Sequence, residues 1–250
     1  MLDYFIPWIE TFQEFLFLAA RAFRNIFRGP HYVDDILIQM DVIGVGSLPI
    51  VVLIGFFSGI IMGLQMGRAL TTYGAQGQIG QIVSISLVRE FGPVLTALLV
   101  AGRNASGIAS EIGSMKVTEQ IDAMRALGTD PIQKLVTPRL IATMFVLPLL
   151  TIIADFIGMF GGALIAFGLL NITWSEFWNN GWRALIYQDL FQGLIKPFLF
   201  AIIISLVGCL YGMRTSGGTQ GVGRATTQAV VVSSIWIFVI TAFIDPLFFT

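Results

Sequence analysis

Long apolar segments are the feature that most limits what this 250-residue chain can fold into. The first, residues 48–66, holds 19 residues without a charge. An α-helix needs about 20 such residues to cross the hydrocarbon core of a bilayer. Four more apolar segments follow at about 82–101, 140–170, 191–213 and 230–249. Charged residues make up 12% of the chain, against about 25% in soluble domains. The sequence therefore predicts an all-α integral membrane protein with five transmembrane helices.

The N-terminal residues 1–30 show apolar and aromatic side chains at helical spacing, with arginines toward the end. This pattern is typical of an amphipathic helix that lies in the membrane interface. The alternative is a true span, but Glu10 and Glu14 would be costly near its middle. Gly29-Pro30 ends the helix. Residues 31–250 are then expected to form one transmembrane domain, which begins with a short re-entry segment at 31–47.

Composition excludes several classes of function. The net charge of −1 gives no electrostatic basis for binding nucleic acid. The chain has one cysteine, Cys209, and one histidine, His31, so a His/Cys metal site and an HExxH metalloprotease are both excluded. Acidic residues precede the basic ones at the N-terminus, the reverse of the order in a cleaved signal peptide. We expect no catalytic residue and no metal site.

The distribution of basic residues predicts the orientation. With the N-terminus in the cytoplasm, ten of the fourteen lysines and arginines lie on the cytoplasmic side, and the exceptions are Arg68, Arg89, Arg183 and Lys196. Short cytoplasmic loops carry such an excess. The C-terminus is then outside. The loops at 68–81 and 214–226 are rich in glycine and expected to be irregular. Trp174, Trp178 and Trp182 are expected at the outer membrane boundary.

A polar segment at 103–134 separates the second and third predicted spans. The segment carries charges of both signs, and Gly128-Thr129-Asp130-Pro131 is a stop signal for a helix within it. A segment of this kind on the cytoplasmic side predicts a coupling helix that docks into a groove of a soluble partner through apolar contacts ringed by polar ones. The alternative is a solvated helix on the membrane surface. The candidate apolar contacts are Ile112, Met115, Ile121 and Met124, and the candidate polar contacts are Glu111, Lys116, Glu119, Asp122 and Arg125.

Ionisable residues inside the predicted spans are the candidates for a substrate pathway. Arg89 and Glu90 lie beside Gly92-Pro93, where a helix is expected to kink. Charges at this depth must face protein or a water-filled cavity. Either they line a cavity, or they form a structural ion pair. Lys196 and Asp245 join the candidates, whereas Asp155 is interpreted as structural. Gly55, Gly59 and Gly63 either form a helix-packing face or reflect the ordinary abundance of glycine in membrane helices.

The stretch REFGPVLTALLVAGRNASGIASEIGSMKVTEQIDAM, residues 89–124, resembles the signature region of the MlaE/YrbE permeases. These are membrane subunits of ABC systems that move lipids together with MCE proteins. The resemblance extends from about Asp41 to the C-terminus. Residues 122–128 also weakly resemble the EAA loop of ABC importer permeases, with Met124 in place of a small residue.

The resemblance implies a homodimer in the bacterial inner membrane that moves phospholipid and maintains outer-membrane lipid asymmetry. Its implied partners are a cytoplasmic ABC ATPase, a periplasmic MCE-domain protein and a STAS-type accessory protein. In this view Arg89 and Lys196 contact the lipid head, and Glu90 and Asp245 either hold those cations in place or gate the pathway by changing partners. The apolar candidates that would contact the tails are Leu64, Phe91, Leu95, Leu98 and Leu99.

Three alternatives remain beside the phospholipid permease. The chain also fits the YrbE-type subunit of an Mce importer for sterols or fatty acids, a chloroplast lipid-import relative, or a passive channel or scaffold. Residues 218–225 have the glycine spacing of a phosphate loop, but Arg224 and Ala225 replace its lysine and hydroxyl residue. We therefore expect no cofactor in this chain and place ATP and magnesium on the partner ATPase.

Overall fold

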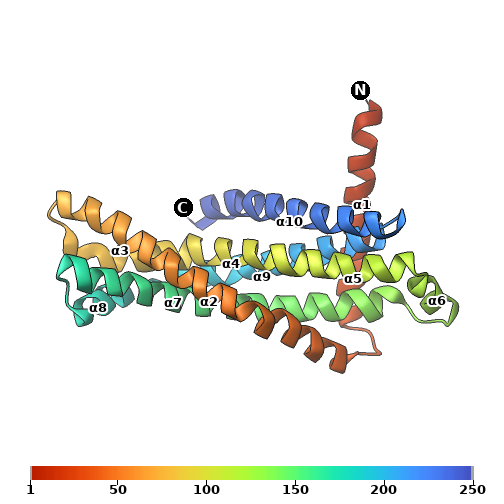
Figure 1. The fold of residues 1–250 in the computed structure, drawn as a ribbon, viewed down its shortest axis with the longest axis horizontal. Coiled ribbons are helices and arrows are strands. Elements are labelled where there is room, and N and C mark those ends of the chain that lie inside the picture. Colours follow the sequence, from red (N-terminus) through yellow and green to blue (C-terminus); the bar gives the residue numbers. More distant parts are fainter. Residues whose placement is uncertain (1, 249–250) are drawn as a thin grey trace. The chain divides into compact units, whose positions relative to one another are not determined.

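The computed structural model describes the backbone of residues 2–248 and the side chains of residues 10–247. Helices follow one another along this part of the chain, and it contains no strand (Figure 1). The longer helices are α1 (Leu2–Ile26), α2 (Val33–Thr72), α7 (Thr137–Leu170), α9 (Tyr187–Met213) and α10 (Gly218–Phe248). The shorter ones are α3 (Ile79–Ser86), α4 (Gly92–Val100), α5 (Ser106–Val117), α6 (Gln120–Ala126) and α8 (Trp174–Ala184).

Four short elements of non-α geometry join these helices. η1 (Gln76–Gln78) is a 3₁₀ turn, whereas η2 (Leu87–Phe91), η3 (Ala101–Ala105) and η4 (Ile132–Val136) are π-helical. Five helical segments of the described chain are long and apolar enough to cross a membrane: Val33–Thr72, Gln76–Val117, Ile132–Leu170, Tyr187–Met213 and Gly218–Leu247. The prediction of an all-α membrane protein with five spans is confirmed. The predicted end of the fifth span at residue 249 lies outside the described residues.

Several loops predicted from composition are helical instead. Residues 33–47 are not a re-entry segment, because they continue into the first span as part of α2. That helix has 40 residues, or about 60 Å at 1.5 Å per residue, twice the thickness of the hydrocarbon core. α2 also runs to Thr72, and α10 begins at Gly218. Hydropathy marks only the part of a helix that needs lipid around it, so it misses the polar turns at either end.

The described chain forms two compact units. The first contains the residues through Ile43, Val100–Phe145 and Phe200–Ile237. Its core brings together Ala22 of α1, Ile112 of α5, Ile121 of α6, Leu140 of α7 and Cys209 of α9, all buried. α1 is therefore packed through one face, while Phe12, Leu16 and Phe17 on this helix stay exposed.

The second unit contains Gly44–Leu99, Val146–Leu199 and the described residues from Phe238. Its core includes Met62 of α2, Ile79 and Val83 of α3, Met159 of α7 and Phe177 of α8. α3 and α8 lie side by side in this unit (Figure 1).

Glycines allow α2 and α7 to pack closely in the second unit. A Cβ at Gly59 would collide with the backbone carbonyl of Gly158, and one at Gly55 would lie 2.9 Å from the carbonyl oxygen of Ala154. Backbone atoms cannot move aside as a flexible side chain can, so small residues are required here. The helix-packing interpretation of Gly55, Gly59 and Gly63 is confirmed.

Candidate functional site

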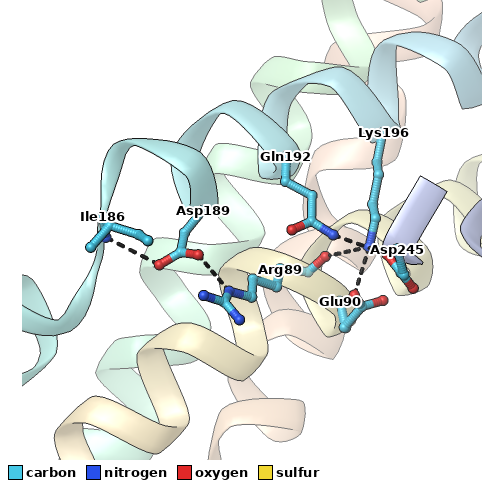
Figure 2. Close-up of polar contacts among 7 residues, drawn as sticks. All are labelled: Arg89, Glu90, Ile186, Asp189, Gln192, Lys196 and Asp245. Carbon is cyan, nitrogen blue, oxygen red and sulfur yellow. Dashed lines mark hydrogen bonds and ion pairs between the residues drawn. The ribbon is translucent and has the colours of Figure 1, made fainter. Parts of the chain in front are cut away.

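The buried ammonium group of Lys196 is the centre of a polar cluster in the second unit (Figure 2). Its Nζ donates to Glu90 Oε1 at 2.7 Å and contacts Asp245 Oδ1 at 2.5 Å. It also donates to the backbone carbonyl of Arg89 at 2.8 Å. The Lys196 side chain is 0% exposed, so three oxygen acceptors take the place of water around this cation. The contacts connect α9 to η2 and to α10.

The local backbone explains why the Arg89 carbonyl is available. In an α-helix this carbonyl would accept from the N–H four residues later, but that residue is Pro93, which has none. The chain forms a π turn at η2, in which Gly92 N–H bonds the carbonyl of Leu87. π turns inside α-helices often occur at functional sites. The kink expected at Gly92-Pro93 is thus a change of helical register that leaves an acceptor for Lys196.

The Arg89 guanidinium has its own carboxylate partner. Arg89 Nε donates to Asp189 Oδ1 at 2.5 Å, and Asp189 Oδ2 accepts from the backbone N–H of Ile186 at 3.1 Å. Asp189 therefore receives a backbone donor at the start of α9 while it holds Arg89. Its side chain is 2% exposed, against 26% for Arg89.

A buried amide completes the cluster. Gln192 Nε2 donates to Asp245 Oδ1 at 2.9 Å (Figure 2). Asp189, Gln192 and Lys196 are separated by three and four residues, so they lie on one face of α9. Neither Asp189 nor Gln192 was among the residues predicted from the sequence, because Asp189 lies just before the fourth predicted span and Gln192 carries no charge. The helical spacing from Lys196 is the signal that could have found both.

The cluster holds two cations and three carboxylates, so its formal charge is −1 when all five groups are ionised. Glu90 and Asp245 are 34% and 22% exposed, whereas Lys196 is enclosed. A ligand therefore reaches Glu90, Asp245 and Arg89 before it reaches Lys196. Ionic contacts of this kind join α9 to η2 and to α10. In the described part of the chain, no group of three or more His, Cys, Asp or Glu residues is arranged to hold a metal ion.

The apolar pathway candidates lie beside α2. Phe91, Leu95 and Leu99 line a narrow pocket of about 10 Å³, while Leu64 and Leu98 are half-buried and do not line it. A volume of about 10–15 Å³ is the least that holds one water molecule. One copy of the chain therefore offers no room for a lipid tail at these residues.

The polar segment at 103–134 is not a single helix. Glu119 has a left-handed backbone conformation, φ 60°, and separates α5 from the seven-residue α6. Lys116 Nζ donates to Asp122 at 2.8 Å across this turn, and Arg125 Nη1 donates to the same carboxylate at 2.9 Å within α6. The hydrogen bond from Lys116, more than the charge of Arg125, lowers the pKa of the Asp122 carboxyl below its usual range. The segment is thus a compact helical corner.

The candidate apolar contacts of this segment differ in exposure. Ile112 and Ile121 are buried in the first unit's core, and Met115 and Met124 pack partly against it. The most exposed apolar residue here is Leu127, at 84%. Of the polar candidates, Glu111 pairs with the buried Arg139 at 2.7 Å. Glu119, Asp122 and Arg125 are exposed on the surface, and Lys116 is partly so.

Comparison with known proteins adds relatives along nearly the whole chain. A probable ABC transporter permease protein of Synechocystis is 40% identical over 242 residues, which cover 97% of this chain and 92% of that protein. The permease protein MlaE of an intermembrane phospholipid transport system from Haemophilus influenzae is 36% identical over 209 residues, covering 82% of this chain and 80% of the relative. The chloroplastic protein TRIGALACTOSYLDIACYLGLYCEROL 1 of Arabidopsis thaliana is 36% identical over 232 residues, covering 93% and 66%.

The family described as permease MlaE matches residues 36–247, which contain four of the five candidate spans, all but the first three residues of the other, and both sets of candidate residues. The resemblance seen in residues 89–124 therefore extends through the multi-pass membrane region. The chain is a member of the MlaE permease family.

Proposed function

We propose that the chain is the membrane permease of an ABC transporter that moves phospholipid at the bacterial inner membrane and so maintains outer-membrane lipid asymmetry. The observation that carries the proposal is the match over residues 36–247, together with a relative whose name specifies intermembrane phospholipid transport. In this proposal a separate ATPase binds ATP and magnesium. An Mce-type importer for sterols or fatty acids is the second candidate, because the same fold and cluster would serve it.

The proposed topology places the N-terminus in the cytoplasm and residue 250 outside. α1 then lies in the cytoplasmic interface of the membrane. Its described exposed face carries Phe12, Leu16 and Phe17, which suit the acyl–headgroup boundary. Arg214 contacts Glu14 at 3.2 Å and Thr11 at 2.6 Å, so the interfacial helix is tied to the end of α9. Residues 1–30 remain a separate interfacial element in this proposal, and residues 31–250 one functional permease domain.

A homodimer is proposed because one copy has little enclosed space along the pathway residues. Only 22% of the most apolar stretch of α2 and 11% of that of α10 are buried, against 67% for α9. α2 and α10 therefore offer apolar surface to a second copy. Two facing copies would enclose a space for lipid tails lined by Leu64, Phe91, Leu95, Leu98 and Leu99.

Arg89, Glu90 and Asp245 are proposed to meet the lipid head at the edge of that space. The charges suit a zwitterionic or anionic head, because Arg89 supplies a cation and the exposed carboxylates lie next to it. Lys196 is proposed to act through its neighbours, since its side chain is fully enclosed.

Movement is proposed to pass from the ATPase to the cluster along one helical segment. Gln76–Val117 is continuous over 42 residues and contains η2, η3 and α5. A shift of the π register at η2 by one residue would turn the side chains before it by about 100° relative to those after it. Glu90 would then leave Lys196. The cluster would thus have two arrangements, which ATP binding would favour differently.

The docking surface proposed for the ATPase is the corner formed by α5 and α6. The central apolar contact is Leu127, which was not among the predicted residues but is 84% exposed. Met124 lies beside it, and the exposed polar residues nearby are Glu119, Asp122 and Arg125. A periplasmic MCE-domain protein and a STAS-type accessory protein complete the proposed complex.

A matched pair of surface substitutions tests this function. Leu127 and Tyr73 are 84% and 83% exposed, and the proposed topology puts them on opposite sides of the membrane. We expect Leu127→Asp to prevent copurification of the ATPase and to stop ATP-dependent phospholipid movement in proteoliposomes, whereas Tyr73→Asp keeps both. An ATPase that never copurifies with the wild-type chain, even after crosslinking in native membranes, would favour a passive channel or scaffold.

A further inference from the structure

A second apolar cavity, of about 290 Å³, lies in the second unit between α7, α8 and α9. It shares no lining residue with the narrow pocket beside α2. Its wall is made of aliphatic and aromatic side chains, among them Ile152, Phe156, Trp182 and Leu194. These four are 49%, 52%, 53% and 44% exposed, so the cavity is open at the surface of transmembrane helices, where the surrounding medium is lipid.

One carboxyl group interrupts this apolar wall. Asp155 lines the cavity and is the one ionisable side chain among its lining residues, all of which the structure describes. The residue is 9% exposed, and its Oδ1 is buried with no hydrogen-bond partner. Oδ1 is packed against Gly92, where a Cβ would collide with it. A buried polar group without a partner is destabilising, so this carboxyl needs a partner that the chain does not provide.

The aromatic side chains at the cavity limit what can enter it. Trp182 stacks on Trp178 of the same helix, with ring centres 6.2 Å apart and planes at 24°. Tryptophans gather where the hydrocarbon meets the headgroups. Trp182 lines the same cavity as Asp155, so the carboxyl and an aromatic side chain of the kind found at the membrane boundary face one ligand, with apolar wall around them.

The lack of basic side chains in the cavity wall limits the chemistry of the ligand further. No lysine or arginine lines this cavity, so a phosphate would find no counter-ion there. A protonated carboxyl offers one O–H donor, which suits an uncharged oxygen acceptor. We propose that the Asp155 cavity binds one chain of a membrane glycerolipid, with the carboxyl group hydrogen-bonded to an ester or hydroxyl oxygen of the lipid's glycerol region.

Photolabelling tests this site without using transport as the readout, so its failure would leave the proposed function standing. The full chain is placed in vesicles of phosphatidylethanolamine and phosphatidylglycerol that contain a phosphatidylethanolamine with a diazirine in one acyl chain. After illumination, labelled peptides are identified by mass spectrometry. We expect label on the peptides around residues 152–159 and 185–194.

Three variants decide the outcome. Leu194→Trp fills the cavity and should remove the label. Asp155→Leu should lower it about fivefold, the factor expected for one hydrogen bond, whereas Asp155→Asn keeps a donor and should retain it. Unfolding temperatures show that each variant is folded. Equal labelling of the wild-type chain and Leu194→Trp would overturn the proposal, as would protein–protein crosslinks at this face in place of lipid, because another chain would then cover the cavity.

Discussion

Replacement of Lys196 by methionine is the most direct test of the polar cluster. Methionine keeps most of the volume of the side chain and removes its charge. The substitution leaves Glu90 and Asp245 next to each other without the cation that joins them at 2.7 and 2.5 Å. It also leaves the Arg89 carbonyl without the donor that Pro93 cannot supply.

The size of the effect follows from burial. Removing one partner of a buried ion pair costs about 3–5 kcal/mol, because the remaining charge is unpaired. Glu90 and Asp245 are 34% and 22% exposed, so water or protonation relieves part of the cost, and the lower value of about 3 kcal/mol applies. For a domain of this length the unfolding temperature changes by about 2–4 °C per kcal/mol, so Lys196→Met should lower it by about 6–12 °C.

The measurement is thermal unfolding in one mild detergent, followed by tryptophan fluorescence. A triple variant, Lys196→Met with Glu90→Gln and Asp245→Asn, removes the unpaired charges and should recover more than half of the loss. Lys116→Met is the matched control, because its pair with Asp122 lies at the surface and should contribute little to stability. If the triple variant were as unstable as Lys196→Met, the cost would come from packing, and the charge argument would be refuted.

Three further predictions concern other parts of the chain and use the same unfolding measurement. Gly59→Ala should cost about 1–3 kcal/mol, because its Cβ meets backbone of α7, whereas Gly168→Ala faces open space and should cost nothing. Glu111→Gln should lower stability more than Arg139→Met, because it leaves the charge of Arg139, which is 4% exposed, without its partner, whereas Arg139→Met leaves a Glu111 that is 55% exposed to water. The reverse order would contradict the burial argument. The lowered pKa of Asp122 stabilises the fold above the ordinary aspartate pKa, and this contribution is lost as pH falls toward the lowered folded value. Asp122→Asn should therefore lose less stability in acid than the wild-type chain does. An acid profile equal to that of the wild-type chain would contradict the pKa argument.

The membrane architecture was predictable because it depends on composition over long windows. All five spans appear where apolar segments were found, since about 20 consecutive apolar residues have few other stable environments. The ends of the helices were not predictable in this way. Polar turns such as 33–47 carry no hydropathy signal, yet they continue the helix as part of α2 because nothing in them breaks it.

The polar cluster was predictable in part. Charges inside spans had to find partners, so Glu90, Lys196 and Asp245 were recognised as a group. The partner of Arg89 was not found, because Asp189 lies just outside the fourth predicted span, after a stretch rich in tryptophan. The pairing depends on a π turn, which moves Arg89 relative to the α-helical register. A register change of this kind follows from packing and from the missing N–H of Pro93, and neither appears in a count of charges.

The coupling segment shows what amphipathic patterns leave open. Ile112, Ile121 and Leu127 are all apolar residues in a polar stretch, and periodicity treats them alike. A straight helix would place one apolar face toward a single neighbour, but the left-handed Glu119 turns the chain between α5 and α6. Both isoleucines then point into the core of their own unit, and Leu127 remains 84% exposed beyond the end of α6. Which apolar residue stays exposed is therefore decided by one backbone conformation that side-chain periodicity does not encode.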